Sequence, residues 1–264
     1  MHGLLARGGD RRVTGLLGAL RFRTRVPIPG RHDVAHRRVV PWFPVAGALI
    51  GAAVGGVAAG LGEWLTPMVA AALAVVVGLL ITGAFHEDGL ADCADAFGGG
   101  WTPEQRLAIL KDSRHGTYGV AALCASIVVR VIAAGSIPGQ AAVFAGFVAA
   151  HTLGRAAAVA VLAGTRPAAP DAQGLGVSAG RELCASAAAC SVVAGIAIVA
   201  LTSGWWVGPL AAIAALGAAA TAALSVRKLG GVVGDALGAV EQVVECLVLV
   251  AVAALAAHQS LWWA

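Results

Sequence analysis

The chain has 264 residues, of which 59% are hydrophobic and only 12% are charged, and its mean hydropathy is +0.83. A soluble domain carries roughly 25% charged residues, so this composition excludes a soluble globular protein and indicates an integral membrane protein. The net charge of +4 does not indicate nucleic-acid binding, because basic loops of membrane proteins mainly set their topology. The fold class expected is an all-α, polytopic membrane helix bundle.

Apolar stretches long enough to cross a hydrocarbon core of about 30 Å predict about seven transmembrane helices. They cover residues 40–60, 66–85, 118–136, 140–163, 183–202, 205–225 and 233–257. With a cytoplasmic N-terminus, sixteen of the 18 lysines and arginines fall in the inside segments 1–39, 86–117, 164–182 and 226–232. This distribution follows the positive-inside rule and predicts a multi-pass protein of the cell (inner) membrane. Residues 1–264 are expected to form one domain, with 1–39 as a basic cytoplasmic lead-in and 86–117 as the largest cytoplasmic loop.

The first predicted span carries glycines at every fourth position, Gly47, Gly51 and Gly55. Glycines at this spacing lie on one face of a helix and let a second membrane helix approach closely. The sequence therefore predicts a tight helix–helix contact along this face.

Directly after the second predicted span, the sequence Phe-His-Glu-Asp-Gly-Leu-Ala-Asp-Cys-Ala-Asp places four carboxylates and a histidine beside an apolar run. On a helix, Asp88, Asp92 and Asp95 project from one face. Like charges repel there, whereas Mg²⁺ binds carboxylate oxygens and bridges them to phosphates. Glu87 lies one position off that face, and His86 is either a hydrogen-bonding anchor or a substrate contact. The alternative is a solvated loop whose acids point to water.

A second polar segment follows a short helix that is expected to begin at Pro103, with Thr102 as its cap. Its charges, hydroxyls and glycines indicate a site for an anion such as a phosphate. The residues expected to bind substrate there are Lys111, Ser113, Arg114, Gly116 and Thr117. The alternative is a basic loop that only sets topology.

The last predicted span contains three acids, Asp235, Glu241 and Glu245. Acids inside an apolar helix face the bundle interior or water rather than lipid. Charge counting places them at the membrane face where the first acidic cluster emerges. The alternative is that they form ion pairs with Arg130 or Arg155, the two basic residues inside spans. Arg155 either neutralises carboxylates or binds phosphate, because a guanidinium does both.

Carboxylates for a metal and cations for a phosphate, gathered at one membrane face, predict an Mg²⁺-dependent transfer of a phosphate-linked group. Composition and spacing do not identify the substrate. A cation-coupled transporter is the alternative from another class. It is less favoured, because Glu63 is the only carboxylate on the predicted outer side.

Four motifs, in order along nearly the whole chain, then carry a resemblance to a known family. They are Thr24–Pro29, His86–Asp95, Lys111–Gly119 and Gly234–Glu245. They read Thr-Arg-Val-Pro-x-Pro, His-x-Asp-Gly-Leu-Ala-Asp-x-x-Asp, Lys-Asp-Ser-Arg-x-Gly-Thr-Tyr-Gly, and Gly-Asp-x-Leu-Gly-Ala followed by two glutamates. The sequence resembles the adenosylcobinamide-GDP ribazoletransferase family, also called cobalamin-5′-phosphate synthase.

Two positions depart from the family pattern. His115 stands where an aliphatic residue is expected, and Val233 replaces the threonine that usually precedes Gly-Asp. The run Asp88-Gly89-Leu90-Ala91 is also similar, at a distance, to the metal motif of CDP-alcohol phosphotransferases. The following arginine and the regular aspartate spacing of that motif are absent, so a lipid substrate is only the alternative.

The resemblance implies that adenosylcobinamide-GDP reacts with α-ribazole or its 5′-phosphate to give adenosylcobalamin or its 5′-phosphate and GMP. It implies small-molecule substrates, and the sequence leaves open whether the bundle forms a homo-oligomer. Its expected Mg²⁺ ligands are drawn from Asp88, Asp92, Asp95, Glu87, Asp235, Glu241 and Glu245. Lys111 and Arg114 would stabilise charge on the departing GMP, and either Asp95 or Glu245 would accept the hydroxyl proton.

Overall fold

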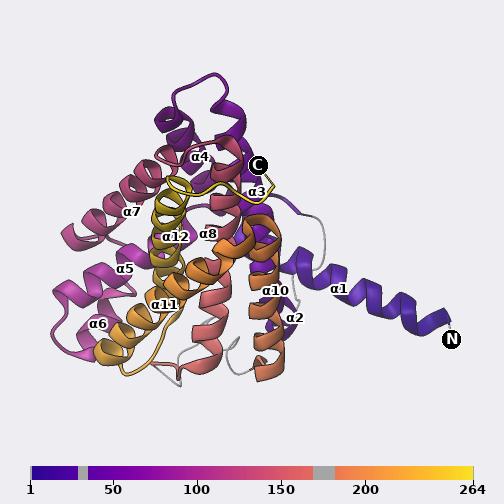
Figure 1. The fold of residues 1–264 in the computed structure, drawn as a ribbon. Coiled ribbons are helices and arrows are strands. Elements are labelled where there is room, and N and C mark those ends of the chain that lie inside the picture. Colours follow the sequence, from indigo (N-terminus) through magenta and orange to yellow (C-terminus); the bar gives the residue numbers. More distant parts are fainter. Residues whose placement is uncertain (1, 29–34, 169–181, 264) are drawn as a thin grey trace.

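The structure, a computed structural model, describes residues 2–28, 35–168 and 182–263, which form helices almost throughout (Figure 1). The helices are α1 (His2–Arg23), α2 (His36–Val39), η1 (Val40–Trp42), α3 (Phe43–Leu61), α4 (Pro67–Thr82), α5 (Phe85–Gly99), α6 (Pro103–Ile109), α7 (Thr117–Gly135), α8 (Gln140–Gly164), α10 (Ala185–Ser203), η2 (Gly204–Trp206), α11 (Val207–Leu229) and α12 (Gly234–Ala256). The predicted all-α membrane bundle is confirmed. Pro29 of the early motif and residues 169–181 of the predicted inside segment lie outside the described residues.

Within the described residues, five helical stretches are long and apolar enough to cross a membrane, or six if one bent pair is counted as a span. They are His36–Leu61, Thr117–Gly135, Gln140–Gly164, Ala185–Leu229 and Gly234–Ala256, with Pro67–Thr82 plus Phe85–Gly99 as the bent pair. Each of the seven predicted spans corresponds to a helix, but the requirement of length and hydropathy lowers the number of spans to five or six. The reasons are that α10 and α11 are joined through η2 into one stretch, and that α4 has only 16 residues.

Helix α8 is the central element of the bundle and is buried along most of its length. Helix α3 lies against it, and the glycine face predicted from the sequence forms the contact. A Cβ at Gly51 would lie 2.5 Å from the Phe147 carbonyl oxygen, and one at Gly55 would lie 2.9 Å from that of Phe144. The two backbones therefore touch at positions where only glycine fits.

This contact gives the first prediction. Gly51→Ala is expected to lower the free energy of unfolding by about 1–3 kcal/mol, because the added methyl group forces α3 away from α8. Gly56→Ala is the matched control on the same helix, since a Cβ there meets nothing within 4 Å. Thermal unfolding in detergent micelles measures both variants. Equal melting temperatures for the two would contradict the packing described.

Helices α4 and α5 meet at a sharp turn and are inclined by 90°. Gly83 (φ 67°) and Ala84 (φ 55°) both adopt the left-handed conformation that ends α4, and only the first is a residue that favours it. The segment 86–117 was predicted as a cytoplasmic loop with one short helix. Instead α5 occupies its first half and packs within the bundle against α12 and α7, because Gly89 and Ala91 keep its inner face small. The short helix expected after Thr102 is confirmed as α6, with a capping box between Thr102 and Gln105.

Candidate active site

Three side chains converge on the outer face of α5. Asp88 and Asp92 lie one turn apart on this helix, and His115 approaches them from the segment between α6 and α7. His115 Nε2 is 3.4 Å from Asp88 Oδ1, and His115 Nδ1 is 3.5 Å from Asp92 Oδ1. One ligand atom from each residue lies within 4.8 Å of the other two, a spacing that a metal ion can bridge. We call Asp88, Asp92 and His115 the acidic site.

Asp95, the third aspartate of the predicted face, has a different set of contacts. Its Oδ2 accepts a hydrogen bond from the Gly116 N–H at 2.6 Å, and its Oδ1 accepts one from the Gly119 N–H at 2.9 Å. The side chain is buried between α5 and the start of α7. Both carboxylate oxygens are therefore occupied by backbone amides, and Asp95 holds the segment that carries His115.

Asp95→Asn is expected to loosen this segment, because the amide NH₂ group cannot accept a hydrogen bond from a backbone N–H. One buried amide is left without an acceptor, which costs about 1–3 kcal/mol. Hydrogen–deuterium exchange over residues 111–119 should become faster at Gly116 and Gly119. Asp112→Asn is the control, since Asp112 lies in the same segment but contacts Arg114 instead. Unchanged protection of both glycine amides in Asp95→Asn would contradict this role.

Helix α12 brings the C-terminal acids to α5. A Cβ at Gly89 would lie 2.8 Å from the Asp235 carbonyl oxygen, and one at Gly238 would lie 3.2 Å from that of His86. The two helices are thus in backbone contact at the level of Asp88. Asp235 is half-buried at the start of α12, next to the acidic site.

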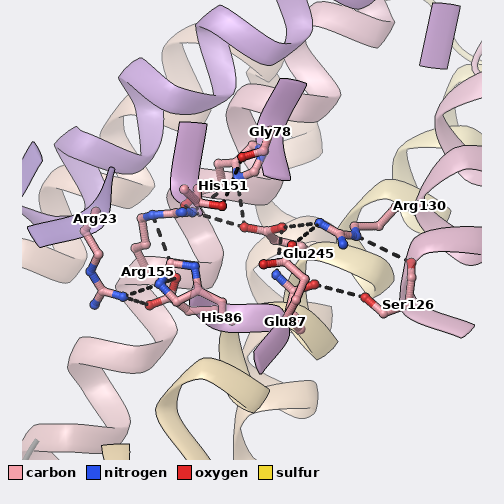
Figure 2. Close-up of polar contacts among 12 residues, drawn as sticks. Arg23, Gly78, His86, Glu87, Ser126, Arg130, His151, Arg155 and Glu245 are labelled. Carbon is pink, nitrogen blue, oxygen red and sulfur yellow. Dashed lines mark hydrogen bonds and ion pairs between the residues drawn. The ribbon is translucent and has the colours of Figure 1, made fainter. Parts of the chain in front are cut away.

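The remaining predicted acids belong to a second group, a buried ionic network in the middle of the bundle (Figure 2). It contains three arginines, three glutamates and two histidines. They are Arg23, Arg130, Arg155, Glu87, Glu241, Glu245, His86 and His151. Its three arginines and three glutamates carry equal and opposite formal charges, as the burial of so many ionised groups requires.

Glu245 is the centre of one half of this network. Its Oε1 lies 2.8 Å from His151 Nδ1 and 3.0 Å from Arg155 Nη1, and its Oε2 lies 3.4 Å from Arg130 Nη1. The same Arg130 nitrogen is 2.9 Å from Glu87 Oε1. Figure 2 shows Glu245 between His151 and Arg130. The ion-pair alternative left open by the sequence is therefore the arrangement found for Glu245.

Glu241 is the centre of the other half. Arg23 Nη1 donates to Glu241 Oε1 at 2.6 Å, and His86 Nε2 lies 3.0 Å from Glu241 Oε2. The Arg23 guanidinium also stacks on the Phe43 ring at 3.8 Å from its centroid, a cation–π contact. His86 therefore acts here as a buried anchor, and α1 is tied to α5 and α12 through one arginine.

The segment 111–117, which was expected to bind an anion, is in contrast open to solvent. Lys111, Ser113, Arg114 and Thr117 are all exposed. Arg114 donates to both Asp112 carboxylate oxygens, at 3.0 and 2.7 Å, and these hydrogen bonds lower the pKa of Asp112 to about 2. Asp112 is thus ionised at any physiological pH. An incoming phosphate would have to replace it as the partner of Arg114.

The structure divides the predicted site residues into these two groups. It brings Asp88, Asp92 and the segment 111–117 together, with Asp235 adjacent. The residues that it places in the ionic network instead are His86, Glu87, Arg155, Glu241 and Glu245. The sequence analysis did not assign His115 or Arg23 to a site. For His115 the available signal was its departure from the family pattern, and for Arg23 it was the position directly before the Thr24 motif.

Comparison with known proteins agrees with this picture. The sequence model of a family described as cobalamin-5-phosphate synthase matches residues 15–253. The chain belongs to this family. It is 38% identical over 256 residues to the adenosylcobinamide-GDP ribazoletransferase of Ralstonia nicotianae, an alignment that covers 88% of this chain and 91% of that protein. It is 40% identical over 253 residues to the enzyme of the same name from Bradyrhizobium diazoefficiens, with 92% and 94% covered. No solved structure matches the chain.

Membership of the cobalamin-5-phosphate synthase family confirms the resemblance that the four motifs carried. It makes the chain a transferase of cobalamin biosynthesis built on membrane helices, and it disfavours the transporter alternative. In this chain, the motif around Asp88 and the motif around His115 meet at the acidic site.

Proposed function

We propose that the chain joins adenosylcobinamide-GDP to α-ribazole or its 5′-phosphate. A ribazole hydroxyl oxygen attacks the phosphorus attached to the cobinamide arm, and the bond from that phosphorus to the GMP oxygen breaks. The products are adenosylcobalamin, or its 5′-phosphate, and GMP. The observation that carries this proposal is the meeting of Asp88 and Asp92 with the segment 111–119 in a member of this family.

Asp88 and Asp92 are the side chains that would hold Mg²⁺, because their oxygens are exposed or half-buried and Mg²⁺ prefers carboxylate ligands. When bound, the ion would neutralise charge on the pyrophosphate. Asp235 lies beside this group at the start of α12 and is assigned to the proton transfer, not to the metal. We exclude Glu87, Glu241 and Glu245 from the ligand set, because arginines in the ionic network already pair with them.

The exposed cations of the 111–117 segment are assigned to the leaving group. Lys111 and Arg114 would bind the phosphate of the departing GMP, with the hydroxyls of Ser113 and Thr117 as further donors. Asp95 acts through the amides of Gly116 and Gly119, which fix this segment on α5. Its contribution is the position of the anion site and not a direct contact with metal.

The hydroxyl proton passes to a carboxylate, for which Asp235 is better placed than Asp95 or Glu245. Both Asp95 oxygens accept backbone hydrogen bonds, and Glu245 is enclosed by His151, Arg155 and Arg130. Asp235 lies next to Asp88 in the first turn of α12 and is half-buried. This assignment replaces both base candidates expected from the sequence.

The acidic site is assigned to the cytoplasmic side of the membrane. Basic residues meet at its end of the bundle: Arg106 Nη1 donates to the Lys228 carbonyl oxygen at 2.8 Å, and Lys228 Nζ donates to the Phe97 carbonyl oxygen at 3.2 Å. Phe97 lies on α5, so the basic end of α11 and the acidic site are on one side. The positive-inside rule makes that side cytoplasmic.

The test is release of GMP by the full-length chain in detergent micelles, with adenosylcobinamide-GDP, α-ribazole and Mg²⁺. We expect one cobalamin product per GMP, and loss of both when EDTA removes the metal. A parallel reaction with CDP-diacylglycerol should give no CMP. Absence of GMP, or CMP release from the lipid, would overturn the proposal.

A further inference from the structure

The position of His115 has a consequence for the metal. Its ring nitrogens lie 3.4 and 3.5 Å from one oxygen each of Asp88 and Asp92. Its side chain is 36% exposed, so an ion from solvent can reach the group. Mg²⁺ has little preference for imidazole nitrogen, whereas first-row transition ions bind it well. The donor set of the acidic site is therefore not a typical magnesium set.

His115 is held in place independently of any metal. The next residue, Gly116, donates its N–H to Asp95, and Gly119 does the same one turn of α7 later. Asp95 is on the same helix as Asp88 and Asp92, so these bonds fix the backbone at 115 against the acidic face. An aliphatic side chain at this position would occupy the same place with no ligand atom.

We propose that His115 is a third metal ligand and that it gives this enzyme a preference for a first-row divalent transition ion, such as Mn²⁺ or Co²⁺, over Mg²⁺. The inference rests on the metal site of the proposed function and concerns only which ion occupies it. Two carboxylate oxygens and one imidazole nitrogen bind such an ion and leave positions for water or a phosphate oxygen. The competing explanation is that His115 is only a polar neighbour of the two aspartates, which a metal would displace.

Mn²⁺ itself is the probe that separates these explanations, because its unpaired electrons report directly bound nitrogen. The full-length chain is titrated with Mn²⁺ in detergent micelles, and free Mn²⁺ is followed by electron paramagnetic resonance. Pulsed measurements on the bound ion should show modulation from ¹⁴N, which changes to the ¹⁵N pattern after selective labelling of histidine. His115→Val should abolish this modulation. His258→Val, which removes an exposed histidine near the C-terminus, should retain it.

The affinities give a second readout. His115→Val should weaken Mn²⁺ binding by about tenfold or more, since loss of even an outer-shell partner commonly costs that much. Binding of Mg²⁺, measured by competition, should change by less than about threefold, because its ligands are oxygens. Asp92→Asn should lose tight binding of both ions, which locates them at the acidic site.

Several results would overturn the proposal: nitrogen modulation that persists in His115→Val, Mn²⁺ bound to the wild-type chain without such modulation, or no tight Mn²⁺ binding. All these measurements are made without substrate. A failure of the proposed function would instead appear as absent GMP release by the wild-type enzyme, whatever nitrogen signal its metal gives. The two proposals therefore fail on different observations.

Discussion

Asp92→Asn is expected to lower the rate of GMP release by at least about a hundredfold, because metal stabilisation of charge in such reactions contributes several kcal/mol. Asp92 is half-buried on α5 and faces His115, so its oxygen is the best enclosed of the acidic site. The substitution keeps the size of the side chain and removes its charge. Single-turnover kinetics at saturating metal, with GMP as the product measured, give the rate.

Glu104→Gln is the control for this experiment, because Glu104 is an exposed acid on the neighbouring helix α6. It should keep the wild-type rate within about twofold, since isolated surface charges contribute little. Asp92→Asn should also keep the wild-type melting temperature, because its carboxylate has no buried partner to lose. A wild-type rate in Asp92→Asn under the same conditions would remove Asp92 from the ligand set.

Local features of the fold were predictable because they depend on spacing along one helix. The i, i+4 relation of Asp88 and Asp92 placed both on one face of α5. The four-residue spacing of Gly47, Gly51 and Gly55 predicted a tight contact with another helix, which the structure identifies as α8. Both follow from helix geometry alone. The membrane class followed from composition in the same direct way.

The division of the acids was not predictable from spacing. Asp95 shares a helical face with Asp88 and Asp92, yet one turn further along α5 it is buried against the Gly116 and Gly119 amides, which need an acceptor. Sequence periodicity gives the direction of a side chain but not the element that it meets. The same holds for Glu241 and Glu245, whose partners Arg23 and Arg155 are remote along the chain.

The path of the chain after α4 could also not be predicted from hydropathy. Residues 86–99 are polar enough to resemble a loop, but the small residues Gly89, Ala91 and Ala96 let α5 enter the bundle. The turn that directs it there requires a left-handed conformation at Ala84, which the residue type does not signal. His115, in turn, reaches the acidic site only because this helix lies inside the bundle.

The ionic network supplies the other large expected effect. Glu245→Gln should lower the free energy of unfolding by about 3–5 kcal/mol, the usual consequence of removing one partner from a buried ion pair. The substitution leaves Arg155 and Arg130 with an excess of buried positive charge, since their distances to Glu245 are 3.0 and 3.4 Å. Thermal unfolding in detergent micelles should show a fall of roughly 10 °C.

Glu63→Gln provides the matched control, because Glu63 is exposed in the turn between α3 and α4. Its loss should leave the melting temperature within about 1 °C.

The effect of Glu245→Gln on stability and on GMP release also decides between two roles for Glu245. If Glu245 is a general base that does not support the fold, Glu245→Gln should lose GMP release and keep the wild-type melting temperature. If Glu245 is a structural member of the network, the variant should have a lower melting temperature. Its GMP release should then recover at lower temperature, because more of the protein is folded there. The three short contacts of Glu245 with His151, Arg155 and Arg130 favour the second outcome, because a carboxylate so enclosed has no path to a substrate hydroxyl.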